Sequence, residues 1–124
     1  MEIESHKNLD VWKKAIQLVT LVYSVTKKLP KEEMYGLTSQ MRRAAVSIPS
    51  NIAEGRSKRT TKEYIRYANI AYGSASELET QLIIAGNLGY LEEGDVARAL
   101  AELTDVAKML YRLVCGLEKK LATP

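Results

Sequence analysis

Two long stretches of this sequence carry apolar residues at alternating intervals of three and four, and this spacing constrains the fold more than any other feature. In residues 61–88 the positions are Tyr64, Ala68, Ala71, Ala75, Leu78, Leu82 and Ala85. In residues 95–121 they are Val96, Leu100, Leu103, Ala107, Leu110, Val114, Leu117 and Leu121. This pattern is typical of α-helices that pack nearly parallel, at about 20°. The small alanine side chains in the seam of residues 61–88 permit a neighbouring helix to approach closely.

Two further helices are predicted, over residues 9–29 and 36–55, and no β-type alternation is sustained anywhere in the chain. The predicted boundary residues are Asn8 or Asp10 as the first N-cap, Pro30 as a stop, Thr60 or Thr61 and Asp95 as later N-caps, and Gly89 as a left-handed C-cap. Short connections make consecutive helices antiparallel neighbours. A chain of 124 residues fits one domain. The prediction is an all-α, up-down-up-down four-helix bundle that occupies residues 1–124.

The first predicted helix is apolar over too wide a face for a simple bundle. One seam comprises Val11, Ala15, Leu18, Val22, Val25 and Leu29, and a neighbouring seam comprises Leu9, Trp12, Ile16, Val19 and Tyr23. A stripe this wide exceeds the face that one helix needs to cover a core. Either the helix is unusually buried, or part of the stripe contacts another subunit. We favour the second interpretation, because exposed apolar patches on soluble proteins usually mark interfaces.

The second predicted helix contains a proline in the segment SIPSNIAEG. Pro49 cannot donate a hydrogen bond to the carbonyl of Ala45, and its ring crowds that carbonyl, which costs about 3 kcal/mol in a helix interior. We expect a kink here, with Ser47 or Ser50 bonding the carbonyls that it frees.

A polar stripe follows the same helix, made of Gln40, Arg43, Ser47, Ser50, Asn51 and Glu54. A solvated face usually carries long charged side chains, whereas this stripe is mostly small and hydrogen-bonding, which indicates a packing contact. Arg43 and Glu54 lie three turns apart, too far to pair with each other. A buried charge is costly unless it is paired, so we expect both to engage neighbouring helices or subunits.

Positive charge is concentrated directly after this helix. Between Gly55 and Tyr67 the cations are Arg56, Lys58, Arg59, Lys62 and Arg66, and the only acid is Glu63. This local surplus exceeds the net charge of +3 for the whole chain. The run precedes a predicted helix N-terminus, whose dipole and free amides favour phosphate. A solvated charged loop is the alternative. Tyr64 and Tyr67 could stack on bases, although Tyr64 belongs to the apolar seam.

The sequence lacks the residue patterns that metal binding, nucleotide binding and nucleophilic catalysis require. The only histidine, His6, precedes the first helix, and no Glu-x-x-His pair or phosphate-binding glycine loop occurs. No serine or cysteine has a histidine base on the bundle, and the single Cys115 is expected to be a small core residue. We therefore expect no metal, no cofactor and no enzymatic activity. Without a signal peptide or an apolar run of about 20 residues, the expected location is cytoplasmic, with no membrane partner.

Three segments, DVWKKAIQLV, LPKEEMYGLTSQMRRAAVSIPSNIAEG and ASELETQLIIAGNLGYL, resemble the four-helix-bundle family encoded in intervening sequences of bacterial 23S ribosomal RNA genes. The likeness spans about residues 9–121 and extends to accessory variability proteins of diversity-generating retroelements. It implies a ring-like homopentamer with a basic surface proposed to bind nucleic acid. The motif positions that match the family are Arg42, Arg43, Ser47, Pro49, Asn51, Glu54 and Gly55. Together with Trp12, all of these except Arg42 are the expected structural or assembly residues.

The leading hypothesis is a non-enzymatic homo-oligomer that binds RNA or DNA through backbone phosphates with little sequence specificity. The candidate binding residues are Arg56, Lys58, Arg59, Lys62 and Arg66, with Arg42 as an addition. The alternative is a protein-interaction scaffold or adaptor, whose basic rim docks the acidic surface of a partner such as a polymerase.

Overall fold

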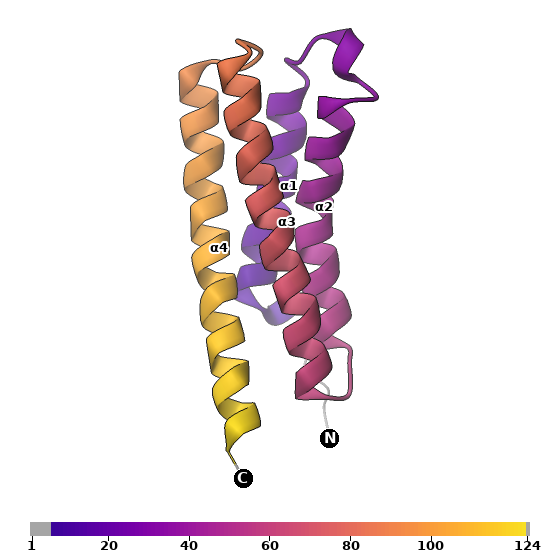
Figure 1. Cartoon of the computed structure of the whole chain (residues 1–124), viewed down its shortest axis with the longest axis vertical. Coiled ribbons are helices and arrows are strands. Elements are labelled where there is room, and N and C mark those ends of the chain that lie inside the picture. Colours follow the sequence, from indigo (N-terminus) through magenta and orange to yellow (C-terminus); the bar gives the residue numbers. More distant parts are fainter. Residues whose placement is uncertain (1–5, 124) are drawn as a thin grey trace.

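The computed structural model describes residues 6–123, which contain four long α-helices and no strand, so the all-α prediction is confirmed (Figure 1). The helices are α1 (Asp10–Thr26), α2 (Leu37–Arg56), α3 (Thr61–Asn87) and α4 (Glu93–Ala122). Single 3-10 turns, η1 (His6–Asn8) and η2 (Lys31–Glu33), precede α1 and α2. None of the helices in this range carries an apolar stretch that would span a bilayer.

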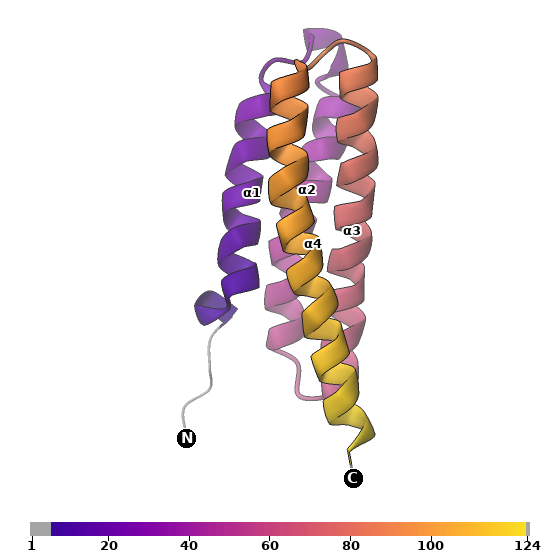
Figure 2. The same ribbon diagram turned by 90° about the vertical axis from the view of Figure 1, so that its left-hand side faces the viewer.

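Each helix packs against two others. Helix α2 lies beside α1 and α3, and α4 lies beside α3 and α1, while no Cα atoms of the two diagonal pairs come within 8 Å of each other among the described residues. Figures 1 and 2 show the chain reversing its direction at each connection. Helix α4 is the longest, and its C-terminal end extends past the start of α1 (Figure 2). The last turns of α4 therefore have neighbours on fewer sides than the rest of the bundle.

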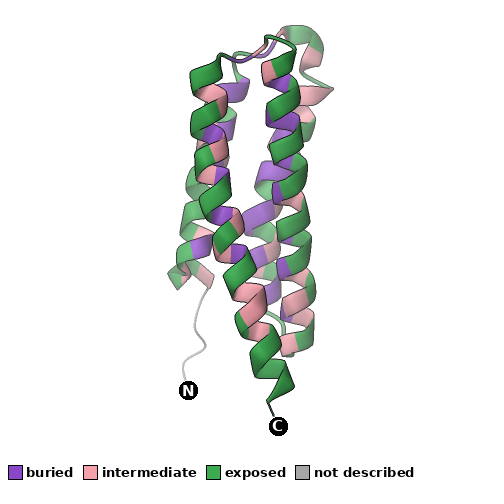
Figure 3. Cartoon of the chain, turned by 60° about the vertical axis from the view of Figure 1, so that its left-hand side comes forward, coloured by how far each residue is buried: buried purple, intermediate pink, exposed green. Residues whose placement is uncertain are grey.

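The core is built from one face of each helix (Figure 3). All seven residues of the seam predicted for α3 are buried, and so is the inner seam of α1 from Val11 to Val25, together with Leu29 after the helix end. The prediction for α4 was wrong in part, because the buried residues of that helix are Ala99, Leu103, Val106 and Leu110. Most of the predicted seam is half-buried, and Leu121 is exposed. Since α4 packs between α3 and α1, its centre-facing stripe is rotated from the seam expected for packing on α3 alone.

Three predicted helix boundaries were wrong. The N-cap of α1 is Leu9, without a side-chain bond, and neither Asn8 nor Asp10 caps it. Helix α1 ends at Thr26, three residues before the expected end, because residues 27–29 continue as tight turns up to Pro30. Helix α4 begins at Glu93, so Asp95 lies within its first turn. There the Asp95 carboxylate pairs with Lys28 at 2.6 Å and ties the end of α1 to the start of α4.

Two other boundaries are confirmed. Thr60 caps α3, with its hydroxyl oxygen accepting from the backbone N–H of Glu63 at 3.2 Å. At the far end Gly89 is left-handed, with φ of 76°. Its N–H donates to the carbonyl of Gly86, and the N–H of Tyr90 donates to that of Ala85, both at 3.0 Å. This pair of bonds is the Schellman motif, which only a left-handed residue, usually glycine, closes.

Helix α2 continues through Pro49, which is buried and does not interrupt the helix. The expectation that Ser47 or Ser50 bonds carbonyls freed by the proline is not met by the bonds found. The hydroxyls of Ser47 and Ser74 instead share a hydrogen bond of 2.8 Å between α2 and α3. Asn51 donates from Nδ2 to the carbonyl and the hydroxyl of Ser47, at 2.8 and 2.9 Å. Part of the polar stripe thus serves the contact between α2 and α3.

Candidate nucleic-acid interface

The basic segment forms the turn between α2 and α3, at one end of the bundle (Figure 1). Arg56 is the last residue of α2 and is half-buried, whereas Lys58 and Arg59 are exposed in the turn. Lys62 and Arg66 are exposed on the first two turns of α3. The five cations predicted from the local charge surplus therefore lie within one turn and the helix ends that flank it.

Gly55 sets how closely the two helices approach at this turn. A Cβ added to it would lie 2.8 Å from Cβ of Tyr67, 3.0 Å from Cδ1 of Tyr64 and 3.3 Å from the Tyr64 carbonyl oxygen. The first distance is shorter than van der Waals contact allows, and it involves an atom next to the backbone of α3. Only glycine fits here without moving α3, so Gly55 fixes the base of the turn.

Glu63, the one acid of the segment, is bonded to one of the cations. Arg66 donates from Nε to Oε2 of Glu63 at 2.8 Å. This hydrogen bond holds the pKa of the Glu63 carboxyl below its ordinary value of 4.5 and raises the pKa of Arg66. Glu63 therefore stays ionised at neutral pH and holds Arg66 in place, and Lys58, Arg59 and Lys62 form no ion pair among residues 6–123.

The two tyrosines of the segment have different surroundings. Tyr64 is 8% exposed, and burial raises the pKa of its hydroxyl, which confirms that it belongs to the core. Tyr67 is half-buried, and two cations lie over its ring. The Nζ atom of Lys58 is 5.2 Å from the ring centroid, and Cζ of Arg66 is 4.5 Å from it. Both distances are typical of cation–π contacts.

Arg42 lies apart from the other candidate cations. It is 14 residues before Arg56 on the same helix, which separates them by about 21 Å at 1.5 Å per residue. Its guanidinium donates to the hydroxyl of Thr26 at 2.9 Å and to the carbonyl of Tyr23 at 3.4 Å, and it lies over the Tyr23 ring. These contacts satisfy the open C-terminal end of α1 and join it to α2.

Two cations outside the predicted basic segment lie at the same end of the bundle as the turn. They are Lys119 and Lys120, in the last turn of α4, and both are exposed. Figures 1 and 2 agree that this helix ends on the side of the bundle where α2 connects to α3. The antiparallel pairing predicted for the last two helices was the available signal, since it places the end of the last helix beside the start of the third.

The predicted assembly residues differ in how far they are buried and in what they contact. Arg43 and Glu54 are exposed and make no ion pair or side-chain hydrogen bond among the described residues, so the expected contact with neighbouring helices is absent there. Trp12 is half-buried, with its ring 5.1 Å from that of His6. The wide apolar stripe of α1 splits into the buried inner seam and an outer seam on which Ile16 and Tyr23 are 39% and 40% exposed.

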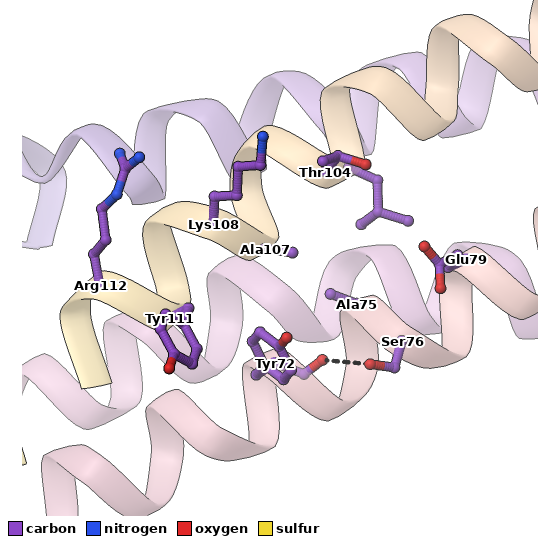
Figure 4. A pocket seen from close by; sticks show the side chains of 10 residues that line it. Tyr72, Ala75, Ser76, Glu79, Thr104, Ala107, Lys108, Tyr111 and Arg112 are labelled. Atoms are coloured by element: carbon purple, nitrogen blue, oxygen red, sulfur yellow. Dashed lines mark hydrogen bonds between the residues drawn. The ribbon is translucent and has the colours of Figure 1, made fainter. Parts of the chain in front are cut away.

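A surface groove of about 520 Å³ lies between α3 and α4. Figure 4 shows Tyr72 and Ser76 on α3, and Lys108, Tyr111 and Arg112 on α4. The Ser76 hydroxyl donates to the carbonyl of Tyr72 at 3.4 Å, so it is not engaged by a base. Cys115 lies next to the groove. It is half-buried, so the prediction that it is a core residue was wrong. A hydrogen bond with its thiol raises the pKa of the Tyr111 hydroxyl.

No group of three or more metal-ligating side chains is present in residues 6–123. The fold and the basic turn thus define a four-helix protein whose most distinctive surface chemistry is a cluster of exposed cations. The chain belongs to the family of 23S rRNA-intervening sequence proteins, whose family model matches residues 7–112.

A solved structure shares this fold. It is a protein of unknown function from the S23 ribosomal protein family of Bacteroides thetaiotaomicron, with a TM-score of 0.79 and 22% sequence identity. The match covers 84% of this chain and 97% of that one. No match was found among curated proteins.

Proposed function

We propose that this protein is a non-enzymatic helical protein that binds RNA or DNA through backbone phosphates with little sequence specificity. The observation that carries the proposal is the cluster of exposed cations around the turn between α2 and α3. Three of them, Lys58, Arg59 and Lys62, form no ion pair among the described residues. The cluster surrounds the N-terminus of a 27-residue helix, whose dipole adds to the attraction for phosphate.

The proposed surface is suited to phosphates and not to base edges. Its groups are mainly ammonium and guanidinium heads on long side chains, which interact with any strand. Lys119 and Lys120 at the end of α4 extend the positive region. Such an interface gains its affinity from counterion release, so it weakens steeply as salt is added.

Affinity for a 20-nucleotide single-stranded RNA is therefore expected to fall about 50-fold between 50 and 200 mM salt. This estimate assumes four phosphate contacts, each contributing about 0.7 to the slope of log K against log salt. Fluorescence anisotropy measures it, and a second RNA of unrelated sequence should bind within about threefold. Absence of binding at 50 mM salt, or an affinity that salt leaves unchanged, would contradict the proposal.

We also propose that the protein acts as a homo-oligomer, a pentamer according to the family resemblance. The outer seam of α1 supports this, since it leaves a row of apolar side chains partly exposed along one helix. Exposed Arg43 and Glu54 on α2 then have partners available on a neighbouring subunit. A symmetric ring would repeat the basic turn once per subunit and would raise avidity for one strand.

Light scattering is expected to give a mass of five times 13.9 kDa for the wild-type protein. Replacing Ile16 with Asp should reduce this mass, because it places a charge in the apolar contact. Ile84→Asp is the matched control, since Ile84 is 42% exposed on α3, which lies diagonally across the bundle from α1. A monomeric mass for the wild-type protein at micromolar concentration would refute assembly.

A further inference from the structure

We infer that Tyr67 is a positioning residue, whose ring holds Lys58 and Arg66 as a paired cation site for phosphate and does not stack on a base. The inference rests on the proposed function and specifies how the same surface meets its ligand. The ligand class is a phosphate chain recognised without its bases.

The two cations come from different parts of the chain and meet at one ring. Lys58 follows the end of α2, and Arg66 lies on the second turn of α3. Their distances to the Tyr67 centroid are 5.2 and 4.5 Å. The cations can be no farther apart than the sum of these distances, which is comparable with the Debye length of about 8 Å at physiological salt. Their fields therefore add at a phosphate placed next to both.

The ring is itself held by the helix contact below it. The Cβ of Tyr67 abuts Gly55 of α2, where even a methyl group would come within 2.8 Å. Arg66 is fixed at a second point by the hydrogen bond from Nε to Glu63. A side chain that is already ordered loses less rotamer entropy when the ligand arrives. The arrangement thus prepares two long, flexible cations for binding.

A stacking role for Tyr67 conflicts with the same contacts. A base that stacks on an aromatic side chain needs the face of the ring. Both cations lie over the ring, within 5.2 Å of its centroid, and Tyr67 is half-buried, so little of the ring is left open to a base. A base that stacked on a face covered by a cation would displace that cation and would lose its contribution to phosphate binding. A chain of phosphates without bases should therefore depend on Tyr67 as strongly as RNA does.

The test measures binding of the full-length protein to a 20-nucleotide single-stranded RNA and to inorganic polyphosphate, with Tyr67→Leu and Tyr67→Phe variants. Tyr67→Leu should lower the affinity for both ligands by a similar factor of about five, because it removes the ring and keeps every charge. Tyr67→Phe keeps the ring and should stay within twofold of wild type for both. Tyr35→Leu is the control, since Tyr35 is 97% exposed at the other end of the bundle.

Two results would overturn the inference while leaving the proposed function intact. One is a Tyr67→Leu variant that loses affinity for RNA but not for polyphosphate, which would indicate stacking. The other is a Tyr67→Leu variant that binds both ligands as tightly as the wild type does. Failure of the wild-type protein to bind RNA at low salt would instead reject the proposed function together with the inference.

A measurement on the wild-type protein keeps the test independent of the stability of the variants. The ring current of Tyr67 should shift the NMR signals of the Lys58 and Arg66 side-chain protons. These shifts are expected to persist when the protein is saturated with either ligand. Their loss on saturation with RNA, but not with polyphosphate, would show that a base has replaced the cations on the ring.

Discussion

Replacing Gly55 with Val is expected to lower the free energy of unfolding by about 3 kcal/mol or more. Overpacking a well-packed core costs about 1–3 kcal/mol, and this site belongs at the upper end. The added Cβ would meet an atom next to the backbone of α3, with the Tyr64 carbonyl oxygen 3.3 Å away. Neither group can rotate out of the way, so relief requires α2 and α3 to separate. Gly55→Ala should lower the free energy of unfolding by less, about 1–2 kcal/mol, because alanine adds the same Cβ but no further methyl groups.

The control for this effect is a glycine in an open part of a helix. A Cβ at Gly116 in α4 would meet nothing within 4 Å. Gly116→Ala should therefore stabilise the protein by about 0.5–1 kcal/mol, through helix propensity alone. Urea unfolding followed by circular dichroism, at one fixed protein concentration, compares the three variants with wild type. A Gly55→Val protein as stable as Gly116→Ala would show that the helices do not touch at this point.

The features of the fold that could be predicted are those decided by neighbouring residues in the sequence. The Thr60 cap and the Gly89 C-cap each depend on the hydrogen bonds of one helix end, and both are confirmed. The seam of α3 was also correct. The seam of α4 was correct only at Leu103 and Leu110, because periodicity shows that a stripe exists but not how the helix is rotated. That rotation depends on packing against α1 as well as α3.

The candidate site shows the same division. A count of charges along the chain locates the basic turn, since its cations are close in sequence. It cannot show that Arg42 contacts the end of α1 or that Lys119 and Lys120 lie at the end of the bundle where the turn is. The closeness of Gly55 to Tyr67 is also tertiary. These facts depend on how the helices are placed against one another, which local patterns do not encode.

Reversing the charge of Lys58, Arg59 and Lys62 to Glu is expected to lower the affinity for single-stranded RNA by at least 100-fold at 100 mM salt. Each lost phosphate contact lowers the slope of log K against log salt by about 0.7, and each new carboxylate repels the strand. These three side chains are exposed, and none forms an ion pair among the described residues. The fold should therefore tolerate the change. Arg56 is left unchanged because it is half-buried.

The matched control reverses Lys27, Lys31 and Arg98, which are also exposed and without an ion pair in residues 6–123 and lie at the other end of the bundle. It changes the net charge by the same amount, away from the turn. If affinity followed net charge alone, both triple variants would lose binding equally, and the proposed interface would be rejected. If the turn is the interface, the control should retain affinity within about threefold, because charges farther than a Debye length of about 10 Å at 0.1 M salt are largely screened. Anisotropy titrations at 100 mM salt distinguish the two, since screening there separates local contact from long-range attraction.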